Sequence, residues 1–198
     1  MYHINEDQRS IQSKNMLYRA LSEKLREKDF KSITIQEVVK SAQMGRSTFY
    51  RNFDHLEDVL LWKCDEAFQD LYRRILESIS PRTVQAGVEK FPFVLPFFRY
   101  WHADSEIIEC LVAANRIDMI FSAFENTVKK LVLKLHPAAL KLSPHFEYFL
   151  AFRSGAMIRI LLQWIKQNKR LSPEELYQLI KAQSEGLIPR TADVDPPE

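Results

Sequence analysis

The chain has 198 residues, of which 46% are hydrophobic and 27% charged, a balance typical of a globular protein with one large core or two small ones. It has only four glycines and nine prolines, and few alternating runs rich in Val and Thr, so we predict a nearly all-α fold. The formal net charge of +2 does not by itself indicate a nucleic-acid binder. Two cysteines cannot build a disulfide framework, and both are expected to be buried free thiols in a reducing cytoplasm.

Membrane association and enzymatic chemistry both lack support in the sequence. Residues 1–10 are polar, and no apolar run approaches the roughly 20 residues of a membrane-spanning helix, so we expect a soluble, cytoplasmic protein. The five histidines show no spacing that puts two of them on one helical turn with a carboxylate, and the glycines are too scattered for a phosphate-binding loop. We therefore predict no metal site, no cofactor and no enzymatic activity.

The first predicted elements are three helices within residues 1–54. After a frayed start at residues 1–5, apolar residues at helical spacing predict a helix over residues 6–28. A second, short helix begins after Thr34, whose hydroxyl can cap it, with Glu37 at the capping-box position. A corner at residues 42–45 leads to a third helix, in which Phe49 and Phe53 point inward because they are four residues apart. The outward side chains are of the types that bind phosphates and base edges: Arg46, Ser47, Thr48, Tyr50, Arg51 and Asn52.

Residues 34–60, TIQEVVKSAQMGRSTFYRNFDHLEDVL, resemble the DNA-binding signature of the TetR (tetracycline-repressor-like) family of transcriptional regulators. The resemblance implies a helix-turn-helix domain at residues 1–54 that binds double-stranded DNA. It implies base contacts by Arg46, Ser47 and Thr48, phosphate contacts by Thr34, Tyr50 and Asn52, and either role for Arg51.

Three positions depart from the family pattern. Gln43 stands where the family usually has Gly, and Gly45 stands where it usually has a Ser or Thr cap. Leu56 replaces a phosphate-binding Lys, and we expect the neighbouring His55 to take over that contact.

Residues 55–198 form the predicted regulatory and dimerisation domain, which opens with one long helix. An apolar pattern over residues 56–80 predicts a helix of about 37 Å that joins the DNA-binding part rigidly to the rest. In the family, the corresponding helix is the lever that transmits ligand binding to the DNA-binding part.

The stretch FPFVLPFFRYWH at residues 91–102 has the most unusual composition, since six of its twelve residues are aromatic. Pro92 and Pro96 are expected to interrupt a helix and open space between neighbours. One reading is a simple hydrophobic core, and the other is an apolar pocket for a small hydrophobic effector. The predicted pocket residues are Trp62, Phe93, Phe97, Phe98, Trp101, Phe121 and Phe124.

Four more helices are predicted, over residues 104–114, 116–136, 145–168 and 173–186, the last capped by Ser172 and Glu175. The final two resemble the pair that forms a four-helix dimer interface in the TetR family. The predicted interface residues are Phe149, Phe152, Ala156, Ile160, Trp164, Leu176 and Leu179.

The resulting hypothesis is a homodimeric transcriptional regulator, a repressor that binds a palindromic operator and is released by a small hydrophobic ligand. One alternative is a family member that is controlled by a protein partner and that could be an activator. Its core would be filled, and its surface would carry an apolar patch. The other is a helical carrier of a hydrophobic ligand that no longer binds DNA, which the departures at Gln43, Gly45 and Leu56 would favour.

Overall fold

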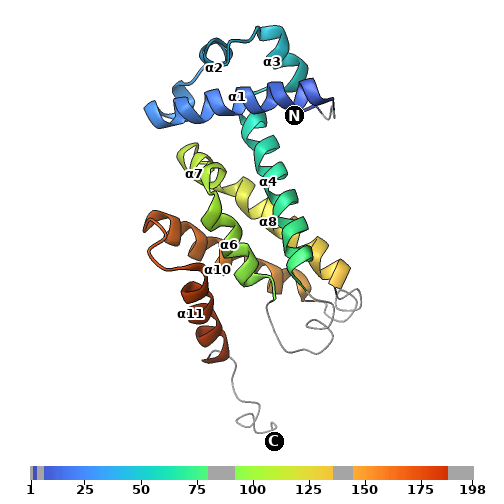
Figure 1. Ribbon diagram of the computed structural model, residues 1–198, viewed down its shortest axis with the longest axis vertical. Helices are drawn as coiled ribbons and strands as arrows, with labels where there is room; N and C mark the ends of the chain where they lie inside the picture. The colour runs from blue at the N-terminus through green and yellow to red at the C-terminus, as the bar shows by residue number, and fades with distance from the viewer. Residues whose placement is uncertain (1, 4–6, 80–91, 136–144, 187–198) are drawn as a thin grey trace, which may run out of the picture.

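The computed structural model describes residues 2–3, 7–79, 92–135 and 145–186, and these residues form an all-helical fold (Figure 1). Three helices at one end form a unit that we call the head: α1 (Gln8–Glu27), α2 (Ile35–Ser41) and α3 (Arg46–Asn52). A short 3-10 turn, η1 (Phe30–Ser32), connects α1 to α2. The predicted fold class is thus confirmed.

Helix α4 (Leu56–Ser78) leaves the head and runs along the other helices, which we call the body (Figure 1). It packs against α6, α7 and α8, so one continuous helix joins the two parts, as the long apolar pattern predicts. Helix α8 also packs against α10, and α11 packs against α6. The body helices are α6 (Val94–Ala103), α7 (Glu106–Ala113), α8 (Ile117–Leu135), α10 (Phe146–Lys166) and α11 (Pro173–Gly186). The division at residue 54 remains a prediction.

Helix starts follow the capping chemistry of the sequence. The Thr34 hydroxyl accepts the backbone N–H of Glu37 at 3.3 Å, while the Glu37 carboxylate accepts the backbone N–H of Thr34 at 2.9 Å. Ser172 and Glu175 make the same reciprocal pair ahead of α11, at 3.2 and 2.7 Å. These side chains satisfy donors that a helix start leaves unpaired, which is why both helices begin where the sequence predicts.

Pro96 does not interrupt α6, contrary to the sequence expectation. It occupies the third position of the helix, within the first turn, where the backbone N–H has no intrahelical acceptor and its loss costs little. The helix therefore runs unbroken from Val94 to Ala103. Its aromatic side chains enter the body core, where Phe97 and Phe98 are fully buried.

The N-terminal segment is not frayed where the structure describes it. Tyr2 forms an isolated antiparallel bridge with Phe53, and its hydroxyl donates to the Asp65 carboxylate on α4 at 2.8 Å. The His3 backbone N–H donates to the carbonyl of Asn52 at 2.9 Å, and the buried Lys14 ammonium donates to the carbonyl of His3 at 2.6 Å. This segment therefore ties the end of α3 to α1 and α4.

Head and body also meet directly, between α1 and α7. The Tyr18 hydroxyl donates to the Cys110 sulfur at 3.8 Å, and Arg26 pairs with Glu106 at 3.1 Å. Burial raises the pKa of the Cys110 thiol to about 11 and that of Cys64 to about 12, so both buried thiols stay protonated at neutral pH. Among the described helices, none is long and apolar enough to cross a membrane.

Candidate nucleic-acid interface

A small aromatic core fixes the position of α3 against α2. Phe49 and Phe53 are fully buried, with ring centroids 5.9 Å apart, and Phe53 also packs against Trp62 of α4 at 6.2 Å. Val38 and Val39 of α2 are buried in the same core. Because all these side chains point inward, the opposite face of α3 is left to solvent.

The corner between α2 and α3 has left-handed backbone geometry at Gln43. Its φ angle is +54°, in the region that favours glycine, which explains why the TetR pattern has Gly at this position. The backbone N–H of Met44 donates to the carbonyl of Val39 at 2.8 Å and closes the turn. Gly45 caps α3 in extended conformation without a side-chain hydrogen bond. Gln43 therefore adopts a backbone conformation that is more favourable for glycine, and Gly45 begins α3 without a side-chain cap.

The solvent face of α3 presents two cations, a hydroxyl and a phenol. Arg46, Ser47 and Arg51 are exposed, and 53% of the Tyr50 side chain is accessible. The Arg46 guanidinium donates to the amide oxygen of Gln36 on α2 at 2.8 Å, which holds it across the helix-turn-helix. Thr48 is half-buried beside this face. The structure thus brings together most of the predicted DNA-contacting residues.

Asn52 does not belong to this face, and its predicted phosphate contact is incompatible with its position. The side chain is only 2% exposed. Its amide nitrogen donates to the carbonyl of Thr48 at 2.8 Å, and its amide oxygen accepts the Ser10 hydroxyl at 2.6 Å. Asn52 therefore joins α3 to α1 from inside the head. The periodic pattern could not reveal this, because the buried partner Ser10 lies 42 residues away in the sequence.

Thr34 is exposed, but Glu37 occupies both of its donors. The Thr34 hydroxyl and backbone N–H both donate to the same carboxylate oxygen, at 2.8 and 2.9 Å. The Lys28 ammonium binds the other oxygen at 2.6 Å and, together with the Thr34 bonds, lowers the pKa of Glu37 to about 2. Thr34 therefore acts on the start of α2, and a phosphate contact by its hydroxyl would require the loss of this bond.

His55 and Leu56 differ sharply at the start of α4. His55 is exposed at the N-cap position, and its backbone N–H donates to the Asp58 carboxylate at 2.8 Å. Leu56 is buried, 9% exposed, within the hydrophobic core. Leu56 therefore packs in the core and offers no side chain to a phosphate, whereas the phosphate contact of the exposed His55 remains a prediction.

The chain matches known families through its C-terminal part. Residues 89–186 match the TetR C-terminal family described as "Transcriptional regulator C-terminal region". This part of the chain therefore belongs to the TetR family of transcriptional regulators. No curated protein matches it significantly.

Two crystal structures share the TetR fold of this chain. Lin0861 from Listeria innocua is similar with a TM-score of 0.76 and 16% sequence identity, over 94% of this chain and 96% of that one. A TetR transcriptional regulator from Streptococcus agalactiae 2603V is similar with a TM-score of 0.60 and 20% identity, over 88% of this chain and 94% of that one.

The residues predicted to line a TetR effector pocket pack mainly against one another. The Phe97 ring lies 5.1 Å from that of Phe98 and 5.2 Å from that of Phe124, and Trp101 lies 5.2 Å from Phe68. Trp62 instead packs against the head, while Phe93 and Phe121 are half-buried at the edge of the core. The aromatic stretch therefore fills the described core, which agrees with the simpler of the two sequence readings.

The residues predicted for the TetR dimer interface divide into two groups. Phe149, Phe152 and Leu179 are 53%, 70% and 51% exposed, while Ala156 is exposed and Ile160 half-buried. Trp164 and Leu176 are buried, 3% and 5% exposed, and offer almost no surface to a second chain. Trp164 faces inward because its indole packs against Phe98 at 5.5 Å and donates to the carbonyl of Leu171 at 2.9 Å.

Metal ligation finds no support in the described part of the chain, where no three His, Cys, Asp or Glu side chains gather around a common point. The sequence also did not indicate the contacts of the buried Lys14 and of Tyr2 and His3 with the rest of the head and α4. They carry no helical pattern and no motif, so only the three-dimensional contacts reveal them.

Proposed function

We propose that this TetR-family chain is a cytoplasmic, homodimeric repressor that binds a palindromic operator in double-stranded DNA. The observation that carries the proposal is the exposed face of α3, where Arg46, Ser47, Tyr50 and Arg51 stand on a helix fixed by buried aromatic rings. Side chains of these types donate to base edges and phosphates, and the first residues of a recognition helix lie deepest in the major groove. Arg46 is the principal base-reading residue in this proposal.

The exposed apolar side chains of α10 and α11 support the dimer. Phe149, Phe152 and Leu179 would cost free energy if they stayed in water, and a second copy of the chain would cover them. Two heads related by a two-fold axis read half-sites one helical turn apart, or a multiple of it, about 34–36 Å.

The regulatory signal has two candidates. In the first, a small hydrophobic effector enters the body and changes the spacing of the heads, to an extent limited by its differential affinity for the two spacings. In the second, a protein partner binds the body and provides the control. The close packing of Phe97 with Phe98 and Phe124 favours the second candidate, because an effector in the aromatic core would first have to separate these rings.

Selection of binding sites from random duplex DNA, at about 150 mM salt to suppress non-specific binding to phosphates, tests the proposal. We expect a palindrome with fixed half-site spacing. Arg46→Ala should weaken binding to it by about 1–3 kcal/mol, whereas Arg170→Ala, an exposed cation outside the head, should have no effect. Enrichment of no sequence by the wild-type chain would refute the proposed function and favour a carrier of hydrophobic ligands.

A further inference from the structure

The exposed arginine at the start of α3 is held by a neutral side chain. Arg46 donates from Nη2 to the amide oxygen of Gln36, in the first turn of α2, at 2.8 Å. Both residues are exposed, and neither side chain has another partner within the described part of the chain. The carboxylate that follows Gln36, that of Glu37, is bound by Lys28 at 2.6 Å and by Thr34 at 2.9 Å. Arg46 therefore keeps most of its donors for an external partner.

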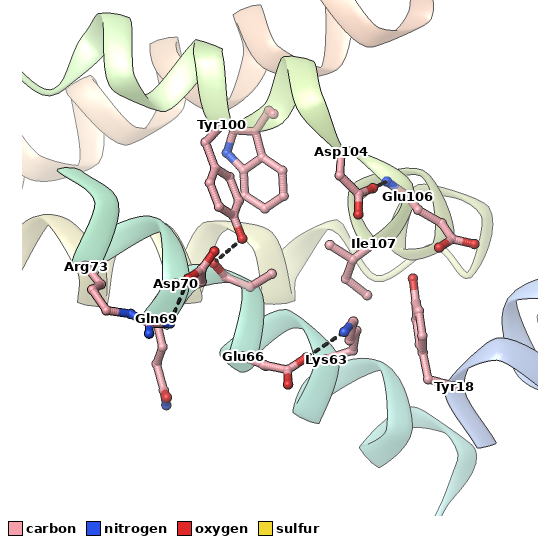
Figure 2. A pocket seen from close by; sticks show the side chains of 12 residues that line it. Tyr18, Lys63, Glu66, Gln69, Asp70, Arg73, Tyr100, Asp104, Glu106 and Ile107 are labelled. Atoms are coloured by element: carbon pink, nitrogen blue, oxygen red, sulfur yellow. Dashed lines mark hydrogen bonds and ion pairs between the residues drawn. The ribbon is translucent and has the colours of Figure 1, made fainter. Parts of the chain in front are cut away.

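The amide partner distinguishes Arg46 from cations of the body that pair with acids. Figure 2 shows two such pairs on α4, Lys63 with Glu66 at 2.6 Å and Arg73 with Asp70 at 2.7 Å. A carboxylate offsets the charge of its cation and repels the phosphates of DNA, whereas an amide does neither. Gln36 therefore restrains Arg46 without weakening its attraction to an acceptor-rich partner.

The hydrogen bond also fixes which end of the Gln36 amide is engaged. A guanidinium only donates hydrogen bonds, so the amide oxygen must face Arg46 and the amide nitrogen turns away from it. A glutamine that reads adenine needs both groups, because it donates to N7 and accepts from the N6 amino group. With its oxygen engaged, Gln36 cannot make this pair, and its effect on base choice must pass through Arg46.

Arg46 retains the donor pattern that guanine requires. Guanine presents two adjacent acceptors, O6 and N7, on its major-groove edge, and an arginine binds both with a pair of parallel N–H groups. In a guanidinium, Nη2 belongs to two such pairs, one shared with Nη1 and the other with Nε. The bond to Gln36 occupies one pair and leaves the other free. Of the four bases, only guanine offers two adjacent acceptors in this groove.

We propose that Gln36 is a positioning residue that holds Arg46 for a guanine in each operator half-site. This inference rests on the proposed DNA-binding function. The bond restricts a long, exposed side chain before DNA arrives, so less conformational entropy is lost when Arg46 meets the base. A misaligned arginine still binds phosphates, which carry no sequence information. Loss of Gln36 should therefore weaken the choice of base more than the affinity for DNA in general.

Selection of binding sites from random duplex DNA, carried out with variants of the full chain, tests this role. The wild type should enrich guanine at one position of each half-site, and Arg46→Ala should abolish that preference. Gln36→Ala should lower the guanine preference at the same position at least threefold and leave the other positions unchanged. Gln36→Glu keeps an acceptor for Arg46 and should retain more of the preference than Gln36→Ala, even if its charge weakens binding to all sequences.

The matched control is Lys40→Ala, which removes an exposed cation from the same helix and should leave every base preference unchanged. An unchanged guanine preference in Gln36→Ala would overturn the inference. So would the loss of an adenine preference in that variant, because Gln36 would then read a base directly.

NMR of the isotopically labelled protein without DNA tests the contact itself, with the Arg46 guanidinium signal identified by its absence in Arg46→Lys. Rotation of this guanidinium about its Nε–Cζ bond should be at least threefold slower in the wild type than in Gln36→Ala. Equal rotation rates would refute the positioning role. If the wild-type chain enriches no sequence, the proposed function fails and the guanine contact with it, while the rotation rates still decide whether Gln36 holds Arg46.

Discussion

Replacing Asn52 with alanine separates a structural role from a phosphate contact at one position of α3. The change removes two buried hydrogen bonds, those to Thr48 and Ser10, and leaves the Ser10 hydroxyl, itself only 8% exposed, without its acceptor. At about 1 kcal/mol for each bond, the free energy of unfolding should fall by about 2 kcal/mol. In a chain of this length, about 2 kcal/mol corresponds to a fall in Tm of roughly 4–8 °C.

Thermal or urea unfolding at fixed protein concentration measures this loss. A double-mutant cycle with Ser10→Ala should give a coupling of about 1 kcal/mol, because the second change removes the hydroxyl that Asn52→Ala leaves unpaired. Operator binding by the folded Asn52→Ala variant should keep the salt dependence of the wild type. Arg51→Ala is the contrasting variant, since loss of an exposed phosphate contact should reduce the slope of log K against log salt by about 0.9 per contact. Unchanged stability of Asn52→Ala together with a reduced slope would refute the buried role.

Three other changes test the turn, the dimer and the capping box. In urea unfolding, Gln43→Gly should raise the free energy of unfolding by about 0.5–1 kcal/mol. The reason is that relief of the left-handed backbone at φ +54° outweighs the added freedom of the unfolded chain. Gln43→Ala, which keeps a Cβ, should give no such gain. Phe152→Glu should convert the proposed dimer to a monomer in sedimentation equilibrium at micromolar concentration, whereas a charge at the exposed Val112 of α7 should not. Persistence of a dimer in Phe152→Glu would exclude this face. Glu37 has its pKa lowered to about 2, chiefly by Lys28, so its stabilising contribution is complete above the usual pKa of 4.5 and is lost as the pH falls toward 2. Unfolding temperatures between pH 6 and pH 3 should therefore fall less steeply for Glu37→Gln than for the wild type; parallel curves would contradict this role.

Local patterns in the sequence predict the helices well, because the starts of α2 and α11 carry their own capping residues and the buried faces of the helices have helical spacing. Thr34 with Glu37, and Ser172 with Glu175, lie three residues apart and act within a single turn. The effect of Pro96 is harder to predict, because a proline is tolerated in the first turn of a helix and disruptive in its interior. A correct prediction therefore needs the helix start to within a residue or two.

Burial on a given face was harder to predict, because it depends on partners that are distant in the sequence. By residue type, Asn52 resembles the exposed polar residues of α3. It is buried because its side chain accepts a hydrogen bond from Ser10 and its carbonyl accepts one from His3 in the N-terminal segment. Trp164 lies on the same helix as the exposed Phe152. It faces inward because its indole packs against Phe98 of α6 and donates a hydrogen bond to the carbonyl of Leu171. The aromatic stretch gave no means to distinguish a filled core from a cavity, since both are lined by the same residue types.

The positions of the three tryptophans allow changes in separate parts of the molecule to be followed by fluorescence. Trp62 packs against Phe53 of the head, Trp101 is buried in the body against Phe68 and Phe97, and Trp164 is buried between α10 and α6. Variants that retain one tryptophan each, with phenylalanine at the other two positions, would therefore report locally. Operator DNA should then alter the emission of Trp62, and a rearrangement of the body should alter that of Trp101 and Trp164, so the order of these events could be timed within one chain.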